Sequence, residues 1–351
     1  MKCISLFSSA GIGEMNFSNI GIQTIVANEL IPIRAKTYEF FHPNTRMING
    51  DITSKDIKDM IMQEIADHKI DLIYATPPCQ GVSLIGKNKS LQAMQEDPRN
   101  YLVFDLFYFI TKLQPRFVII ENVPRFLKLY YPYKSDLLTI ESILNLEYGN
   151  DYNIDADILN AADYGVPQNR ERAIIRMYKK GTKWILPEKT TKISVFEAIG
   201  MLPRLESGEK SNLKNHNARV HSPEHVKWMM NTPTGHSAFE NSFYYPKNKT
   251  GQKLKGFSAT YKRMEWDKPA PTITMRNDAI SSQSNVHPGR LLDDGTYSDA
   301  RVLTLRELFI LSSIEPDIDL PEFASDSQIR YMIGESVPPL MIEKILSGIK
   351  Q

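Results

Sequence analysis

The sequence predicts an α/β fold in which a doubly wound parallel sheet is joined to a second, smaller domain. Short apolar runs alternate with helical patterns as far as about residue 179. A glycine-containing turn at residues 8–13 follows the first apolar run, as in sheets that bind nucleotides at the start of a helix. After residue 179 the alternation stops, and short segments rich in Pro, Gly, Asn and Ser predict a mostly β or irregular domain.

The composition fits a soluble globular protein of one large domain or two smaller ones. The chain has 351 residues, of which 42% are hydrophobic and 24% charged. It contains no run of 18 apolar residues, so no membrane-spanning helix is predicted. Residues 1–7 are too short for a signal peptide, and two cysteines form no disulfide framework. We therefore expect a protein of the reducing cytoplasm that has no membrane partner.

Charge is distributed unevenly along the chain, although the net charge is only +1. Residues 180–300 contain 18 Lys and Arg against 12 Asp and Glu, together with five of the seven histidines. This segment carries a balance of +6, and the remainder carries −5. A basic segment on an otherwise acidic chain indicates a domain that meets a polyanion.

The first three predicted strands are followed by a turn or by an acidic residue. Residues 3–7 form the first strand, and a helix is predicted to begin at Glu14 after the glycine turn. The strand at 23–27 leads into Glu29, and the strand at 46–49 leads into Asp51. An acid at the end of the second strand typically bonds the hydroxyl groups of a ribose. The two acids therefore predict a nucleoside-containing ligand, with helix capping as the alternative.

The fourth strand leads into a cysteine. A helix is predicted at 54–69 and a buried strand at 70–74, after which Pro77 and Pro78 hold the backbone extended up to Cys79. A thiol presented at a strand end is a candidate nucleophile, because the thiolate form attacks electrophilic carbon. The alternative is a small buried hydrophobe, which is the commoner role of a free cysteine.

The next strand supplies a candidate partner for this cysteine. A polar loop is predicted at 83–98, a helix at 101–113 and a strand at 116–120 that ends in Glu121. Ligands of open α/β sheets bind at the carboxyl ends of the strands. We therefore predict that the thiol and the carboxylate face one site.

The remaining elements complete the predicted sheet and the end of the chain. The pattern predicts a helix at 134–147, strands at 152–159 and 173–177, a helix at 301–311, and two helices between 327 and 349 split at 334–339. Thr304 with Glu307 three residues later has the spacing of a capping box.

Six segments and one acid together resemble the DNA (cytosine-5)-methyltransferase family, in its single-chain bacterial or phage form. They occur in the family's order and span nearly the whole chain. The segments are 7–13, 77–80 (Pro-Pro-Cys-Gln), 121–123 (Glu-Asn-Val), 168–172 (Gln-Asn-Arg-Glu-Arg), 301–307 and 334–339, and the acid is Asp51. Ser9 stands where many members have glycine, and Glu335 stands where asparagine is usual.

The resemblance implies a Rossmann-like methyltransferase sheet plus a target-recognition domain. It places the catalytic domain at 1–179 plus 325–351 and the recognition domain at 180–324, because 128 residues separate Arg172 from Arg301. The implied cofactor is S-adenosylmethionine, which leaves as S-adenosylhomocysteine, and no metal is expected. The implied cofactor-binding residues are Phe7, Ala10, Gly11, Gly13, Glu29, Leu30, Asp51, Ile52, Pro78 and Leu102.

The implied reaction is methylation of C5 of a cytosine flipped out of a specific double-stranded DNA sequence. Cytosine C5 is too weak a nucleophile until a thiolate adds to C6, which is the role implied for Cys79. Glu121 in protonated form would bond N3, and Arg172 would hold O2 as negative charge develops there. Arg170 of the same motif completes the implied catalytic set.

Double-stranded DNA is the expected partner, and we expect a monomer in solution. A restriction endonuclease of the same system is a possible functional partner without a stable complex. Recognition of the DNA sequence is assigned to residues 180–300. Arg263, Arg276 and Asn277 are the predicted base readers, because arginine suits guanine and asparagine suits adenine. The alternative is that these side chains contact only phosphate or solvent.

Three other functions are weighed against this one. A related RNA cytosine-5 methyltransferase carries a Cys-Phe-Thr tripeptide that this chain lacks. A nicotinamide-dependent oxidoreductase would have a third glycine where Asn16 stands. A catalytically inactive DNA-binding relative would not need Cys79, Glu121 and Arg172 together.

Overall fold

The computed structural model describes residues 1–78 and 98–350, so Cys79 lies outside the described residues. The chain divides into two compact units. The sheet unit comprises 1–160, 171–188 and 342–351, and the second unit comprises 161–170 and 189–341. This division differs from the predicted domains, because residues 161–170 and 325–341 belong to the second unit and residues 180–188 belong to the sheet unit.

The sheet unit is built on a seven-stranded sheet of order β3-β2-β1-β4-β5-β9-β8. The first five strands of this order are parallel, and β9 runs antiparallel to both of its neighbours. The α/β prediction is therefore confirmed, with a mixed edge to the sheet. The strands are β1 (Lys2–Leu6), β2 (Gln23–Glu29), β3 (Arg46–Asn49), β4 (Leu72–Ala75), β5 (Phe117–Asn122), β8 (Tyr152–Asn160) and β9 (Glu171–Lys179).

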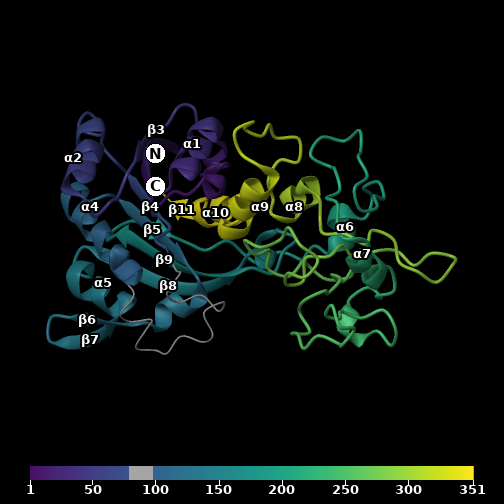
Figure 1. Cartoon of the computed structure of the whole chain (residues 1–351). Coiled ribbons are helices and arrows are strands. Elements are labelled where there is room, and N and C mark those ends of the chain that lie inside the picture. Colours follow the sequence, from purple (N-terminus) through teal and green to yellow (C-terminus); the bar gives the residue numbers. More distant parts are fainter. Residues whose placement is uncertain (79–97, 351) are drawn as a thin grey trace. The chain divides into compact units, whose positions relative to one another are not determined.

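Helices connect these strands, and some differ from the predicted ones (Figure 1). They are α1 (Pro32–Phe41), α2 (Lys55–Glu64), α4 (Asp105–Leu113, preceded by the 3-10 helix η4, Pro98–Phe104) and α5 (Ile140–Tyr148). The helix expected from Glu14 is replaced by two 3-10 helices, η1 (Ile12–Glu14) and η2 (Phe17–Ile20), and α1 was not predicted.

The helix expected at 134–147 begins only at Ile140. The preceding residues form the hairpin of β6 (Tyr130–Tyr133) and β7 (Asp136–Thr139), which Figure 1 shows next to α5. No helix among the described residues is long and apolar enough to cross a membrane. Near the C-terminus, β11 (Ile349–Lys350) pairs with β10 (Lys183–Trp184).

Helices cover both faces of the sheet, as the packing of two neighbouring residues in β2 shows. Val26 and Ala27 point to opposite faces, because side chains alternate along a strand. Val26 belongs to the buried cluster that contains Ile61 of α2 and Leu106 of α4. Ala27 packs instead with Tyr38 of α1. The sheet is therefore doubly wound, as predicted.

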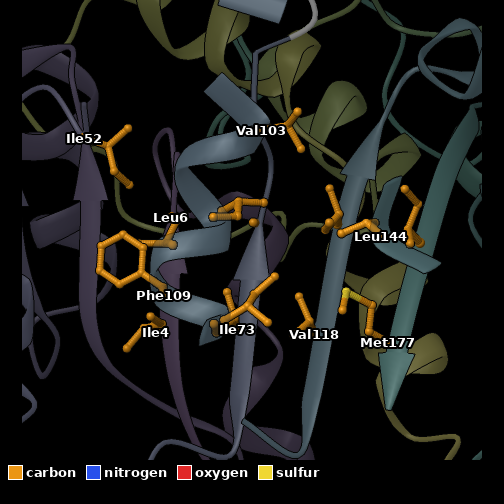
Figure 2. Close-up of a cluster of buried hydrophobic side chains, with 14 of the residues drawn as sticks. Ile4, Leu6, Ile52, Ile73, Val103, Phe109, Val118, Leu144 and Met177 are labelled. Atoms are coloured by element: carbon orange, nitrogen blue, oxygen red, sulfur yellow. The ribbon is translucent and has the colours of Figure 1, made fainter. Parts of the chain in front are cut away.

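The larger cluster forms the core beneath the strand ends (Figure 2). Ile4, Ile73 and Val118 come from three neighbouring strands and are fully buried, as is Phe109 of α4. Burying each such side chain contributes about 1.5–3 kcal/mol. This packing fixes the carboxyl ends of β1, β2, β4 and β5, from which the candidate site residues extend.

The second unit contains short helices joined by irregular backbone. Residues 189–341 are all described and contain isolated bridges but no named strand. The named elements are η6 (Ala161–Tyr164), α6 (Val195–Ile199), α7 (Pro223–Met230), η7 (Ala238–Glu240), α8 (Leu305–Leu311), α9 (Asp326–Glu335) and the start of α10 (Pro339–Leu346). The capping box of Thr304 and Glu307 is present at the start of α8, as its spacing predicted.

Buried arginines take the place of regular hydrogen bonding in the second unit. Its fully buried large side chains include Arg170, Arg263, Arg301 and Arg330. A guanidinium group carries five donors, so one arginine satisfies several loop carbonyls that no sheet ladder pairs. Burial lowers the pKa of Arg263 to about 10, which leaves this side chain charged at neutral pH.

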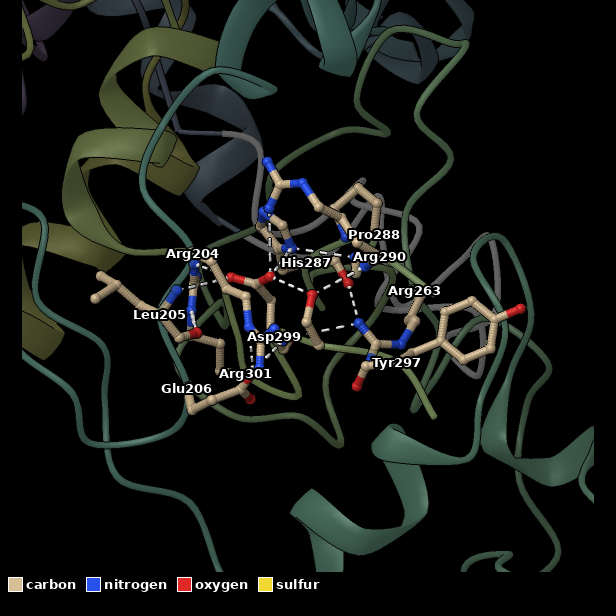
Figure 3. Close-up of polar contacts among 12 residues, drawn as sticks. Arg204, Leu205, Glu206, Arg263, His287, Pro288, Arg290, Tyr297, Asp299 and Arg301 are labelled. Carbon is tan, nitrogen blue, oxygen red and sulfur yellow. Dashed lines mark hydrogen bonds and ion pairs between the residues drawn. The ribbon is translucent and has the colours of Figure 1, made fainter. Parts of the chain in front are cut away.

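Arg301 belongs to a buried polar network, and Figure 3 shows the part of it around Asp299. Its terminal nitrogens donate to both carboxylate oxygens of Glu307 at 2.8 and 2.9 Å and to Asp299 at 2.9 Å. Burial alone would raise the pKa of Glu307, yet the Arg301 guanidinium holds it well below the ordinary value. Burial lowers the pKa of His287 to about 4, and its Nδ1 accepts from the Gly289 N–H. His287 is therefore neutral at pH 7, so the negative charges of Glu307 and Asp299 are balanced by Arg301.

Candidate active site

The turn after β1 has an unusual backbone. Phe7, Ser9 and Gly11 all have left-handed φ values of 59°, 49° and 74°. A Cβ added at Gly11 would lie 2.5 Å from the His42 ring, so only glycine fits there. Ser9 adopts a conformation that favours glycine, and its N–H donates to Glu29 Oε2 at 2.9 Å. The bond to Glu29 therefore helps to hold Ser9 in this left-handed conformation.

Glu29 ties the turn to the end of β2. Its second oxygen accepts from the Ile31 N–H at 2.7 Å, and Arg34 lies 3.8 Å away. The two oxygens of a carboxylate accept about four hydrogen bonds, so two backbone donors leave capacity for a ligand hydroxyl. The side chain is only 6% exposed. Glu29 thus both shapes the turn and has the chemistry to hold a ribose.

Replacing Glu29 by alanine is expected to weaken S-adenosylmethionine binding by about ten- to a hundredfold. Loss of one charged hydrogen bond costs roughly 1.5–3 kcal/mol, and the turn loses the acceptor of the Ser9 N–H. Isothermal titration measures the effect. Glu64→Ala, which removes an exposed partner of Arg46, is the control and should leave the affinity unchanged. Equal affinities for both variants would contradict a role for Glu29.

The ends of β3 and β2 offer a second carboxylate and exposed apolar surface. Asp51 is exposed, and its Oδ1 accepts both the N–H and the hydroxyl of Thr53. Leu30 is 55% exposed at the neighbouring strand end. Ile52 is only 3% exposed and packs in the main core, so it would contact a ligand mainly through its backbone. This mixture of carboxylate and exposed apolar surface fits an adenosine group.

The other predicted cofactor residues lie in the turn or in nearby segments of the sheet unit. Ala10, Gly11 and Gly13 are buried in the turn, Phe7 and Pro78 are half-buried at the ends of β1 and β4, and Leu102 is half-buried in η4. Thr76 joins two of these segments, because its hydroxyl donates to the Phe7 carbonyl at 2.8 Å.

Glu14 is a positioning residue that sequence reasoning missed. This buried carboxyl accepts hydrogen bonds from the hydroxyls of Ser5, Thr24 and Tyr38, and thereby links β1, β2 and α1 behind the turn. Burial raises the pKa of Glu14. Its position directly after Gly13 suggested only the start of a helix, so no sequence signal marked it.

The acidic motif at the end of β5 holds the segment that leads into Cys79. Asn122 Nδ2 donates to the carbonyl oxygen of Pro77 at 3.1 Å. Its Oδ1 accepts from the Val123 N–H at 2.9 Å, which fixes the amide orientation. The carbonyl of Pro77, two residues before Cys79 in sequence, is therefore held by the residue that follows Glu121.

Glu121 and Arg172 form a close pair in the sheet unit. Arg172 Nε lies 2.7 Å from Glu121 Oε1, and each side chain is 11% exposed. The register of β5 and β9 pairs Glu121 with Ile174, so Arg172 lies two residues along on the same face. Arg172 Nη1 also donates to the Glu171 carbonyl. The structure thus brings together two of the four residues that were predicted as catalytic.

Arg170 requires a correction. It is 2% exposed in the second unit, and its terminal nitrogens donate to the carbonyls of Ile273 at 2.8 Å and Gly334 at 2.9 Å. These bonds connect the last turn of α9 to the loop that contains Ile273. The geometry supports a structural role, because a side chain with this burial and these partners has no access to a base.

Two of the three predicted base readers also require correction. Arg263 is fully buried and donates to the carbonyls of Met229 and His287. Asn277 is 1% exposed and donates to the carbonyls of Thr274 and Arg330. Neither reaches a base without unfolding its surroundings. Arg276 is exposed and stays a prediction as a reader.

Comparisons with known proteins agree with this geometry. The family profile described as C-5 cytosine-specific DNA methylase matches residues 1–351. The chain is 51% identical over 346 residues to Type II methyltransferase M1.HgaI of Avibacterium volantium, which covers 99% of this chain and 97% of that protein. It is 29% identical over 351 residues to Type II methyltransferase M1.HphI of Haemophilus parahaemolyticus, with 99% and 86% covered.

Solved structures share the fold at lower identity. A protein encoded within an E. coli prophage has a TM-score of 0.70 at 20% identity, covering 99% of this chain and 98% of that one. The Entamoeba histolytica methyltransferase EhMeth has a TM-score of 0.65 at 18% identity, covering 99% and 97%. Because the family profile spans every residue and the predicted motifs occur in order, the chain belongs to the C-5 cytosine-specific DNA methylase family and is a DNA (cytosine-5) methyltransferase.

Proposed function

We propose that the chain transfers a methyl group from S-adenosylmethionine to C5 of a cytosine flipped out of a specific double-stranded DNA sequence, through a covalent bond between Cys79 and C6. The observation that carries this proposal is the Glu121–Arg172 pair, held at 2.7 Å beside the anchored Pro77 segment. A carboxyl and a guanidinium next to each other suit a ring that accepts a proton at one atom and negative charge at its neighbour.

The strand ends of the sheet unit would hold S-adenosylmethionine. Glu29 would bond the ribose, Asp51 the adenine amino group, and the turn after β1 would lie against the rest of the molecule. When bound, S-adenosylmethionine supplies a methyl group on a positively charged sulfur. The residues present fit such a ligand, because carboxylates with remaining acceptor capacity and the exposed Leu30 occur at adjacent strand ends.

Cys79 would act as the nucleophile. Addition of its thiolate to C6 breaks the C5–C6 double bond and raises the electron density at C5, the atom that is methylated. Removal of the C5 proton by a base and loss of the thiolate from C6 then restore the aromatic ring. Pro78 precedes Cys79 directly, and the Asn122 bond to Pro77 limits where the chain can place the thiol.

Glu121 and Arg172 would stabilise the ring during this addition. Charge that develops toward N3 and O2 is offset by a proton from Glu121 and by hydrogen bonds from Arg172. The two side chains also contact each other, with Arg172 Nε 2.7 Å from Glu121 Oε1. The entering base would therefore replace their mutual contact with contacts to the ring, and Glu121 would act in its protonated form.

The second unit would supply the DNA contacts that select a sequence. Residues 189–300 of this unit hold 16 Lys and Arg against 11 Asp and Glu, and this excess of positive charge suits the phosphate backbone. Flipping a base costs a few kcal/mol, which such contacts offset. Both curated relatives are named Type II methyltransferases. We infer that this chain likewise protects one short sequence from a restriction endonuclease of the same system.

Bisulfite sequencing of plasmid DNA from a host that expresses the chain tests this function. Protected cytosines should appear at one position of one recurring sequence, and an empty-vector host should show none. Random protection, or modification found only in RNA from the same cells, would contradict the proposal and favour the RNA methyltransferase alternative.

A further inference from the structure

A lysine-rich hairpin in the second unit has no role in the site described so far. We call residues 242–257 the basic hairpin. Between residues 241 and 263 the chain has six Lys and Arg and no Asp or Glu. Four of the lysines, Lys247, Lys249, Lys253 and Lys255, are exposed, and within the described part of the chain none of them pairs with a carboxylate. Unpaired like charges repel one another, so a cluster of this kind favours an anionic partner.

The basic hairpin is ordered before any partner binds. Lys247 and Lys253 form an antiparallel bridge, and the Leu254 N–H donates to the Pro246 carbonyl at 2.9 Å. The turn is closed by Asn248, whose Oδ1 accepts from the N–H groups of both Thr250 and Gln252. A preformed hairpin loses less conformational entropy on binding than a flexible loop would.

Exposed aromatic rings lie at both ends of the basic hairpin. Phe243 is 84% exposed and Phe257 is 79% exposed. Gly256 keeps the chain close to Phe239, because an added Cβ would lie 2.3 Å from that ring. Phe257 directly follows this close contact, and its ring is exposed to solvent. Large apolar rings interleaved with lysines are the side chains that proteins place in a DNA groove and on its phosphates.

We propose that the basic hairpin is a duplex-DNA contact, in which its four lysines bind backbone phosphates and Phe243 and Phe257 lie in the adjoining groove. This inference rests on the proposed function, because it names an element of the chain that meets the DNA substrate. It moves DNA contact away from Arg263 and Asn277, which are buried, to exposed lysines that pair with no carboxylate of the described residues.

The first test compares two variants of the full chain with the same change in charge. One has all four hairpin lysines changed to glutamine. The control has Lys69, Lys112, Lys183 and Lys344 changed to glutamine, which are exposed lysines of the sheet unit. Affinity for duplex DNA is measured against salt concentration. Each phosphate contact contributes about 0.9 to the slope of log affinity against log salt. The magnitude of this slope should therefore fall by about 3–4 in the hairpin variant and by less than about 1 in the control variant.

The second test concerns the aromatic rings. Changing Phe243 and Phe257 together to alanine should weaken DNA binding several-fold with an unchanged salt slope, because no charge is removed. Leu146→Ala, which truncates a 56% exposed side chain of the sheet unit, should have no effect.

The outcomes separate the hairpin inference from the proposed function. If wild type methylates cytosine in DNA but the hairpin and control lysine variants have the same salt slope, the hairpin inference is wrong and the function stands. A hairpin effect seen with RNA but not with duplex DNA would overturn the inference in favour of an RNA partner. If wild type binds DNA through the hairpin yet methylates no cytosine, the proposed function is wrong and the hairpin inference stands.

Discussion

Replacing Glu121 by glutamine is expected to slow methyl transfer by about a hundredfold or more, with S-adenosylmethionine binding unchanged. Glutamine has the same shape, and its oxygen still accepts from Arg172, which lies 2.7 Å from the native carboxylate. It cannot deliver a proton to N3 as charge develops there. The loss should therefore appear in turnover and not in affinity for the cofactor. Single-turnover methylation of duplex DNA and isothermal titration measure the two quantities separately.

Glu147→Gln is the matched control for this variant. Glu147 forms an ion pair with Lys134 that is also 2.7 Å long, but in an exposed position of the sheet unit. Turnover should be unaffected by this change. If Glu121→Gln instead lowers the thermal stability of the sheet unit and turnover falls only in proportion to unfolding, Glu121 is a structural residue.

Replacing Arg301 by alanine is expected to destabilise the second unit by about 3–5 kcal/mol, because it leaves buried charges without a partner. The change removes both hydrogen bonds to Glu307 and the bond to Asp299, all inside the unit. It also removes the donor to the Leu205 carbonyl. Hydrogen exchange measured by mass spectrometry should show faster exchange across peptides of residues 189–341.

Lys268→Ala controls for the loss of a charged side chain of the second unit as such. Lys268 pairs with Glu265 on the surface, where removal of an ion pair typically costs about 0–1 kcal/mol. Peptides of the second unit should therefore exchange as in wild type. Equal exchange in the two variants would show that the network around Arg301 is not what holds this irregular unit together.

The strand ends were predictable because they depend on local pattern. Apolar runs followed by Glu29, Asp51, Pro77 and Glu121 place these residues at one edge of a parallel sheet, and the structure has that arrangement. The capping box at Thr304 followed from a spacing of three residues. In each case the relevant partner lies within one element or at the end of the next strand.

The failures arise where residue type does not reveal burial. Arg263 and Asn277 have side chains that suit bases, but the same donors also satisfy loop carbonyls, and the structure uses them in that way. The β6–β7 hairpin was missed for a different reason. Its turn contains Lys134 at a left-handed φ of 54°, where a glycine or asparagine would have been the usual signal.

The central claim is that Cys79 forms a covalent bond to the target base, and trapping with 5-fluorocytosine tests it most directly. Duplex DNA synthesised with 5-fluorocytosine at every cytosine covers each candidate site, and fluorine at C5 blocks the proton loss that releases the thiolate. Wild type with S-adenosylmethionine should give a protein–DNA adduct that survives denaturation, and so should Cys3→Ala, since Cys3 is fully buried in β1. Cys79→Ala should give none. An adduct that persists in Cys79→Ala would contradict the account.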